Sequence, residues 1–248
     1  MHRSIYFFIL FLTIGCGSSN SQNPYLKSVY DYVEVEGGKI WYGILGEGVE
    51  APYLYLHGGP GGRSKGGIYL NKISDKRPVI LMDQLGGGLS TYHEDTTLLK
   101  VDKFVEQVKA LTDELNLNEF YLTGHSWGTA LALEYYLKYP EGVKGIVFNS
   151  PYFSTPIWIA DSDTLITQLP ETIQQDIAIA EKTNSFKTKA YNNAMKAFYR
   201  NFMIRSTNVN WDSIPGYEIF SSSFNRKDIS GNNFIYNYMW GPSEFSPT

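Results

Sequence analysis

This sequence has few cysteines and no clusters of basic residues. Cys16 is the only cysteine, so a disulfide framework cannot form within the chain. The net charge is −4 and the basic residues are scattered, so no cationic surface of the kind that binds nucleic acid is indicated. Internal repeats and low-complexity segments are also missing. We therefore set aside disulfide scaffolds, repeat proteins and nucleic-acid partners.

The N-terminus has the pattern of an export signal. The apolar run at residues 5–12 follows Arg3 and is too short to span a bilayer comfortably, but it suits the core of a signal peptide. Cys16 and a polar stretch come next, which resembles a bacterial lipoprotein signal. We expect a signal peptide over residues 1–15 and a tether over 16–24, with the protein held in the bacterial cell envelope by a lipid on Cys16. A cleaved signal with an incidental cysteine, giving a periplasmic or secreted protein, is the alternative.

Residues 25–153 alternate strand and helix patterns. Gly37 and Gly38 indicate a hairpin between the first two strands. The alternation predicts an α/β fold with a largely parallel sheet, whose site lies at the C-terminal ends of the strands. A chain of 248 residues with 43% hydrophobic content can bury such a core as one domain with an insertion. The expected strands are 30–35, 39–45, 52–57, 78–83, 120–123 and 143–148, and the expected helices are 101–116 and 127–139.

From about Ser154 the alternation stops. The segments 156–169, 170–182 and 187–205 are expected to be helices, and we predict that residues 154–248 form a helical cap over the core. The third helix carries large side chains at helical spacing, namely Tyr191, Met195, Phe198, Tyr199 and Phe202.

Residues 124–128 read GHSWG and satisfy the G-x-S-x-G pattern between an expected strand and an expected helix. In that setting Ser126 lies on a tight turn at a helix N-terminus, where backbone N–H groups and the helix dipole favour developing negative charge. The flanking glycines are needed because side chains there would collide with neighbouring backbone. We expect Ser126 to be a catalytic nucleophile.

Two glycine-rich loops follow other strands. The segment HGGPGG at 57–62 lets backbone N–H groups approach a reacting carbonyl, and we expect the amides of Gly59 and Trp127 to form an oxyanion hole. His57 is expected to fix this loop by hydrogen bonds rather than to act as a base. Asp83 begins the segment DQLGGGLS, precedes the nucleophile and is expected to be structural.

The three motifs in this order resemble the proline iminopeptidase family of α/β-hydrolases, whose pattern is HGGPG, DQxGxGxS and GxSWG. Residues 239–245 are similar to the family's GPxEF stretch, so the resemblance runs from about residue 30 to the last residue. Leu85 stands where arginine is common in that family. The resemblance implies a serine aminopeptidase without metal or cofactor, acting through an acyl-enzyme on Ser126.

The same resemblance implies how the substrate is held. Glu244 would bind the free α-amino group of a short peptide, and Glu218 is a weaker second candidate. A carboxylate in the cap suits this task because it pairs with a terminal ammonium and shuts out longer chains. Aromatic side chains that could line a pocket for a proline ring, or simply pack inside the cap, are Phe153, Trp158, Tyr238 and Trp240.

The general base is the missing part. In α/β-hydrolases the acid and the histidine follow the nucleophile, yet His2, His57, His93 and His125 all precede Ser126. We expect the chain to lack the C-terminal part of a longer hydrolase, which would leave the sheet with an open edge. A naturally shortened peptide-binding protein, or an unconventional base at His93 or His125, are the alternatives.

The main functional prediction is therefore an aminopeptidase that releases N-terminal proline or another small or apolar residue. A carboxylesterase or lactonase of the same fold is the runner-up, because it would share the nucleophile without needing Glu244. Haloalkane dehalogenases and epoxide hydrolases are disfavoured, because their elbow carries aspartate where Ser126 stands. The oligomeric state is not determined by the sequence.

Overall fold

A six-stranded sheet forms the centre of the protein in the computed structural model, which describes residues 30–202. The strands occur in the order β1-β2-β4-β3-β5-β6, and β1 and β2 form an antiparallel hairpin. The pair β2–β4 is also antiparallel, whereas the remaining neighbours are parallel, which confirms the predicted α/β fold. The bounds are β1 Tyr30–Val35, β2 Gly38–Leu45, β3 Tyr53–Leu56, β4 Val79–Asp83, β5 Phe120–Ser126 and β6 Val143–Pro151.

The inner strands are covered on both faces, which explains their continuous apolar sequences. All five residues of β4 are buried, and Leu54 of β3 lies between Ile80 of β4 and Leu122 of β5 in the parallel register. A strand with both faces buried needs apolar side chains at every position rather than at alternate positions. This pattern made the inner strands easy to predict within a few residues.

Different helices cover the two faces. Helices α1 (Val101–Glu114) and α2 (Trp127–Lys138) pack on one face, where Phe104, Val108 and Leu131 join the largest hydrophobic cluster. On the other face lies the 3-10 helix η1 (Ser64–Ile73), whose Ile68 packs with Trp41 and Leu81. Neither η1 nor the short helix η2 (Thr96–Leu98) was predicted. For η1 the reason is its glycine-rich sequence, which has the composition of a loop.

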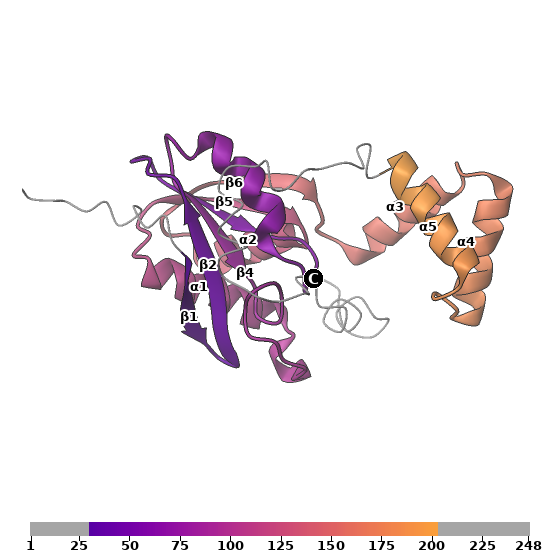
Figure 1. Ribbon diagram of the computed structural model, residues 1–248, viewed down its shortest axis with the longest axis horizontal. Helices are drawn as coiled ribbons and strands as arrows, with labels where there is room; N and C mark the ends of the chain where they lie inside the picture. Colours follow the sequence, from indigo (N-terminus) through magenta and orange to yellow (C-terminus); the bar gives the residue numbers. More distant parts are fainter. Residues whose placement is uncertain (1–29, 203–248) are drawn as a thin grey trace, which may run out of the picture.

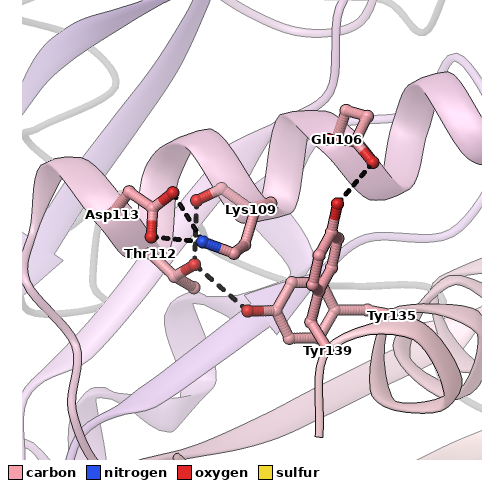
Figure 2. A network of polar contacts seen from close by, with 6 residues as sticks. All are labelled: Glu106, Lys109, Thr112, Asp113, Tyr135 and Tyr139. Carbon is pink, nitrogen blue, oxygen red and sulfur yellow. Dashed lines mark hydrogen bonds and ion pairs between the residues drawn. The ribbon is translucent and has the colours of Figure 1, made fainter. Parts of the chain in front are cut away.

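Polar side chains tie α1 to α2 (Figure 2). The buried Thr112 hydroxyl lies 3.1 Å from the Tyr135 hydroxyl, and it also donates to the carbonyl oxygen of Lys109. One turn away, the Tyr139 hydroxyl donates to the Glu106 carboxylate at 2.9 Å. The contact between Thr112 and Tyr135 satisfies buried hydroxyl groups, the bond between Tyr139 and Glu106 is exposed, and both fix how α2 lies against α1. The position of α2 matters because the helix begins directly after Ser126.

The cap helices α3 (Thr155–Ile166), α4 (Glu171–Thr183) and α5 (Lys189–Phe202) stand together at one end of the molecule (Figure 1). They have a small hydrophobic cluster of their own, formed around Leu169, Ile177, Ala194 and Phe198. The predicted cap is therefore a separate packing unit in its described part. Within residues 30–202, no helix is both long enough and apolar enough to cross a membrane.

The outer edge of the sheet carries exposed apolar side chains. Within residues 30–202, β6 pairs only with β5. Val147 and Phe148 on β6 are exposed, as is Leu137 on the neighbouring α2. Among residues 30–202, this edge therefore offers both unpaired strand backbone and apolar surface.

Candidate active site

Ser126 has a backbone conformation that residues other than glycine rarely adopt. It is the last residue of β5, with φ 50° and ψ −123°, and α2 begins at the next residue. Such a conformation costs free energy and persists only where the surrounding structure enforces it, most often at functional sites. The strand-to-helix turn predicted around the serine is therefore present.

The two glycines of the elbow leave no room for a side chain. A Cβ at Gly124 would overlap the carbonyl oxygen of Gly128, and a Cβ at Gly128 would overlap the carbonyl oxygen of Leu56 at the end of β3. Both obstacles are backbone atoms, which cannot rotate away as a side chain can. The expected collision between a side chain here and neighbouring backbone is confirmed.

The glycine loop, residues 57–62 after β3, lies directly against this turn. A Cβ added to Gly58 would be 3.2 Å from the Cβ of Ser126. Gly59 has φ 132°, in the region that favours glycine, and it lines the same cavity as Ser126. Trp127 is the first residue of α2, so its backbone N–H has no hydrogen-bond acceptor within the helix itself. The Trp127 side chain is buried edge-on against Phe104, which holds that residue in place.

Both ring nitrogens of His57 form hydrogen bonds that hold the glycine loop in place. Its Nε2 accepts a hydrogen bond from the backbone N–H of Gln84 at 3.0 Å, so the ring proton must be on Nδ1. Nδ1 lies 2.7 Å from the carbonyl oxygen of Gly58 and donates to it. Burial lowers the pKa of His57, and the nearby Asp83 carboxylate opposes this effect. The structural role expected for His57 is confirmed.

Asp83 organises the neighbouring loop. Its buried carboxylate accepts from the backbone N–H of Ser64 at 2.6 Å and from that of Leu89 at 2.8 Å. Its carbonyl oxygen accepts from the Ser90 hydroxyl. Since these contacts are all internal to the scaffold, the prediction that Asp83 is structural is also confirmed.

A cavity of about 370 Å³ lies between the elbow and the cap. Gly59 and Ser126 form its floor, and helices α3, α4 and α5 supply the rest of its lining. Carboxylates of Asp163 and Glu181 line it, whereas no lysine or arginine of the described residues does, so its charge favours a cation. The remaining lining residues are Trp158, Ile159, Ser162, Ile166, Ile177, Tyr191, Met195, Phe198 and Tyr199.

The described residues do not provide an imidazole for Ser126. Burial lowers the pKa of His125, yet no hydrogen bond joins His57, His93 or His125 to the serine in the described part of the chain. Nor does any group of three or more histidine, cysteine, aspartate or glutamate side chains gather there in a way that could hold a metal ion.

The structure thus brings together only some of the predicted site residues. Ser126, Gly59 and Trp158 share the cavity, whereas Phe153 does not line it. The helical spacing of large side chains in α5, which includes Met195 and Phe198, can be read from the sequence, whereas the places of Asp163 and Glu181 in the lining cannot. The candidates Cys16, Glu218, Tyr238, Trp240 and Glu244 lie outside the described residues.

Comparison with known proteins agrees with this geometry. The alpha/beta hydrolase fold family matches residues 52–236. A proline iminopeptidase of Heyndrickxia coagulans is 37% identical over 217 residues, which cover 87% of this chain and 72% of the relative. The crystal structure of VinJ has a TM-score of 0.74 at 26% identity and covers 88% of this chain and 73% of that one.

A further solved structure, that of a proline iminopeptidase of Mycobacterium smegmatis, has a TM-score of 0.70 at 25% identity. It covers 88% of this chain and 72% of the other. With the elbow, the glycine loop and the cap all in place, the chain belongs to the proline iminopeptidase family of α/β-hydrolases.

Proposed function

We propose that this protein is a serine aminopeptidase that releases N-terminal proline, or another small or apolar residue, from short peptides. One observation carries the proposal: the strained Ser126 turn opens into a cavity that also contains Gly59 and is lined by the cap helices α3, α4 and α5. Cap helices beside the nucleophile suit removal of a terminal residue, because they limit the room for a long chain on both sides of the scissile bond.

The chemistry follows from the positions of these groups. The hydroxyl of Ser126 attacks the carbonyl carbon of the first residue, and an acyl-enzyme forms as the amine of the shortened peptide leaves. Water then hydrolyses the ester on Ser126 and releases the first residue. The developing oxyanion is stabilised by the backbone N–H groups of Gly59 and Trp127, and a single such donor is typically worth about 10²–10³ in rate. The apolar cap side chains that line the cavity hold the residue that is removed.

The reaction also needs a base to take the proton from Ser126. His57 is unsuitable, since both of its ring nitrogens are engaged in the loop. The described residues therefore supply the nucleophile and the oxyanion donors, and the proposal assigns the base to none of them.

Charge in the cavity supports a substrate with a free amino terminus. Asp163 and Glu181 face the same space as Ser126 and attract a terminal ammonium. Glu244 is the proposed direct partner of that ammonium, and Glu218 is a second candidate.

Three substrates test this function on the purified full-length protein: a prolyl arylamide, its N-acetylated form and a simple aryl ester. We expect the free-amine arylamide to be hydrolysed and the acetylated form to be resistant. The Ser126→Ala variant should not hydrolyse either form. Hydrolysis of the ester alone would instead identify a carboxylesterase or lactonase. Labelling by a fluorophosphonate separates an enzyme from a peptide-binding protein, because only a reactive Ser126 becomes modified.

We also propose that a lipid on Cys16 anchors the protein in the cell envelope. Cell fractionation of the Cys16→Ala variant tests this. We expect the variant to leave the membrane fraction, and retention there would contradict the anchor.

A further inference from the structure

We propose that Gln84 is a positioning residue, which sets the separation of the two oxyanion donors by bridging the glycine loop and the nucleophile elbow. The inference rests on the proposed function for its catalytic meaning. Its structural content can be tested without turnover.

The bridge crosses the end of one strand. Gln84 directly follows β4, His57 follows β3 and Trp127 follows β5, and β3 is the middle strand of these three. Gln84 is fully buried, as are its two partners. Its side-chain Nε2 donates to the carbonyl oxygen of His57 at 3.2 Å, and its Oε1 accepts from the indole Nε1 of Trp127 at 2.9 Å.

The chemistry of the partners fixes the orientation of the amide. An indole N–H can only donate and a carbonyl oxygen can only accept, so only a group with one donor and one acceptor fits between them. The backbone N–H of Gln84 adds a third bond, to Nε2 of His57. Glutamine therefore holds the loop through both the backbone and the ring of one residue while it holds the elbow through Trp127.

The two anchored points lie next to the expected oxyanion donors. The His57 carbonyl belongs to the peptide that precedes Gly58, one residue before the Gly59 amide. The Trp127 indole is on the residue whose backbone N–H is the other donor. Gln84 reaches neither the cavity lining nor Ser126, so it acts through these residues rather than on the substrate.

The test compares Gln84→Leu, which removes both side-chain bonds, with Gln84→Glu, which keeps an acceptor for Trp127 but faces the His57 carbonyl with a carboxylate. Gln107→Leu is the matched control. That glutamine is also buried and accepts from the backbone N–H of Leu85 in the loop after β4, yet it does not touch the elbow. Thermal unfolding first establishes that each variant is folded.

The first readout is the backbone amide resonances of Gly59 and Trp127 and the indole N–H of Trp127 in ¹⁵N–¹H spectra. We expect all three to move in both Gln84 variants and to stay in place in Gln107→Leu. If Gln84→Leu does not fold, Trp127→Phe replaces it, because it removes the indole donor and retains an aromatic ring beside Phe104. Unmoved Gly59 resonances in every folded bridge variant would overturn the proposal.

The second readout uses the prolyl arylamide. We expect kcat to fall about 10- to 100-fold in the Gln84 variants while KM stays within about twofold, because the donors act on the transition state. In Gln84→Glu, the rate relative to the unsubstituted protein should rise as the pH falls, since a protonated carboxyl can donate to the His57 carbonyl again. If the unsubstituted protein does not hydrolyse the arylamide, the proposed function fails and the spectra alone decide on the bridge.

Discussion

Gly58 lies against Ser126 so closely that a methyl group on the glycine would be 3.2 Å from the serine Cβ. The same methyl group would be 3.0 Å from Nδ1 of His125. The glycine loop and the elbow are thus in direct contact, and each limits where the other can lie.

Gly58→Ala should therefore slow the enzyme without unfolding it. The contacts are tight by a few tenths of an ångström, so Ser126 must shift slightly, and small misplacements of a reacting group are costly in rate. We expect a loss of about tenfold in fluorophosphonate labelling of Ser126, with a change in Tm of a few degrees at most. Gly145→Ala in β6 is the control, because its methyl group would meet only the Tyr121 ring at 3.4 Å. Equal labelling rates in the two variants would contradict the close contact.

The second prediction concerns the strain at Ser126. Ser126→Ala and Ser126→Gly both remove the hydroxyl, but only glycine relieves the positive φ of 50°. Relief of such strain gives about 1–3 kcal/mol, which exceeds the roughly 0.4–1 kcal/mol that glycine costs through the unfolded chain. We expect the glycine variant to be more stable than the alanine variant by about 1 kcal/mol in denaturant unfolding. Equal stabilities would mean that the turn is not strained.

Most of the fold could be predicted because the information is local. The apolar runs of β3, β4 and β5 follow from burial on both faces, and the glycines of the elbow follow from the backbone atoms around them. The helix η1 could not be predicted, because its stabilising contact is Ile68 against the far face of the sheet. Its local sequence, rich in glycine, indicates a loop instead.

The site was predictable to the same extent. Ser126 and Gly59 could be identified from short motifs, since each is defined by its own turn. Gln84 belongs to the DQLGGGLS motif, but its role depends on β3 lying between β4 and β5 in the sheet. The order of strands along the chain does not reveal their order in the sheet. Likewise Asp163 and Glu181 belong to different helices, and only the packing of α3 and α4 around the cavity brings them to Ser126.

The third prediction concerns pH. Burial lowers the pKa of His57 in the folded protein, whereas the unfolded chain has the ordinary value of about 6.5. Below that pH the unfolded chain binds a proton that the folded protein does not, so the free energy of unfolding decreases as the pH falls. The slope from one such histidine is at most about 1.4 kcal/mol per pH unit.

His57→Gln should reduce this slope. The variant is less stable at pH 8, because it loses the hydrogen bonds to Gly58 and Gln84. Between pH 7 and 5 its stability should nevertheless fall less steeply than that of the unsubstituted protein, as followed by urea unfolding at each pH. Burial also lowers the pKa of His93 and of His125, so some slope remains. An unchanged slope would show that His57 is protonated in the folded protein.

The last prediction concerns the two carboxylates in the cavity. Asp163→Asn combined with Glu181→Gln removes the negative charge that attracts a terminal ammonium, while the shape of the cavity is kept. Both side chains are exposed, so water and salt weaken the attraction, and we expect KM for the prolyl arylamide to rise only about two- to fivefold. The effect should be largest at low ionic strength and should nearly vanish at about 1 M salt, where the Debye length is roughly 3 Å.

Asp161→Asn combined with Asp176→Asn is the matched control for this experiment. It also removes one charge from α3 and one from α4, but neither Asp161 nor Asp176 lines the cavity. If the total negative charge of the cap attracted the substrate, KM would rise equally in the control. If only the charges inside the cavity attracted it, KM of the control would stay near that of the unsubstituted protein. Any loss of binding that persisted at high salt would point instead to a direct hydrogen bond between one of the two side chains and the substrate, because such a bond is screened far less than a separated pair of charges.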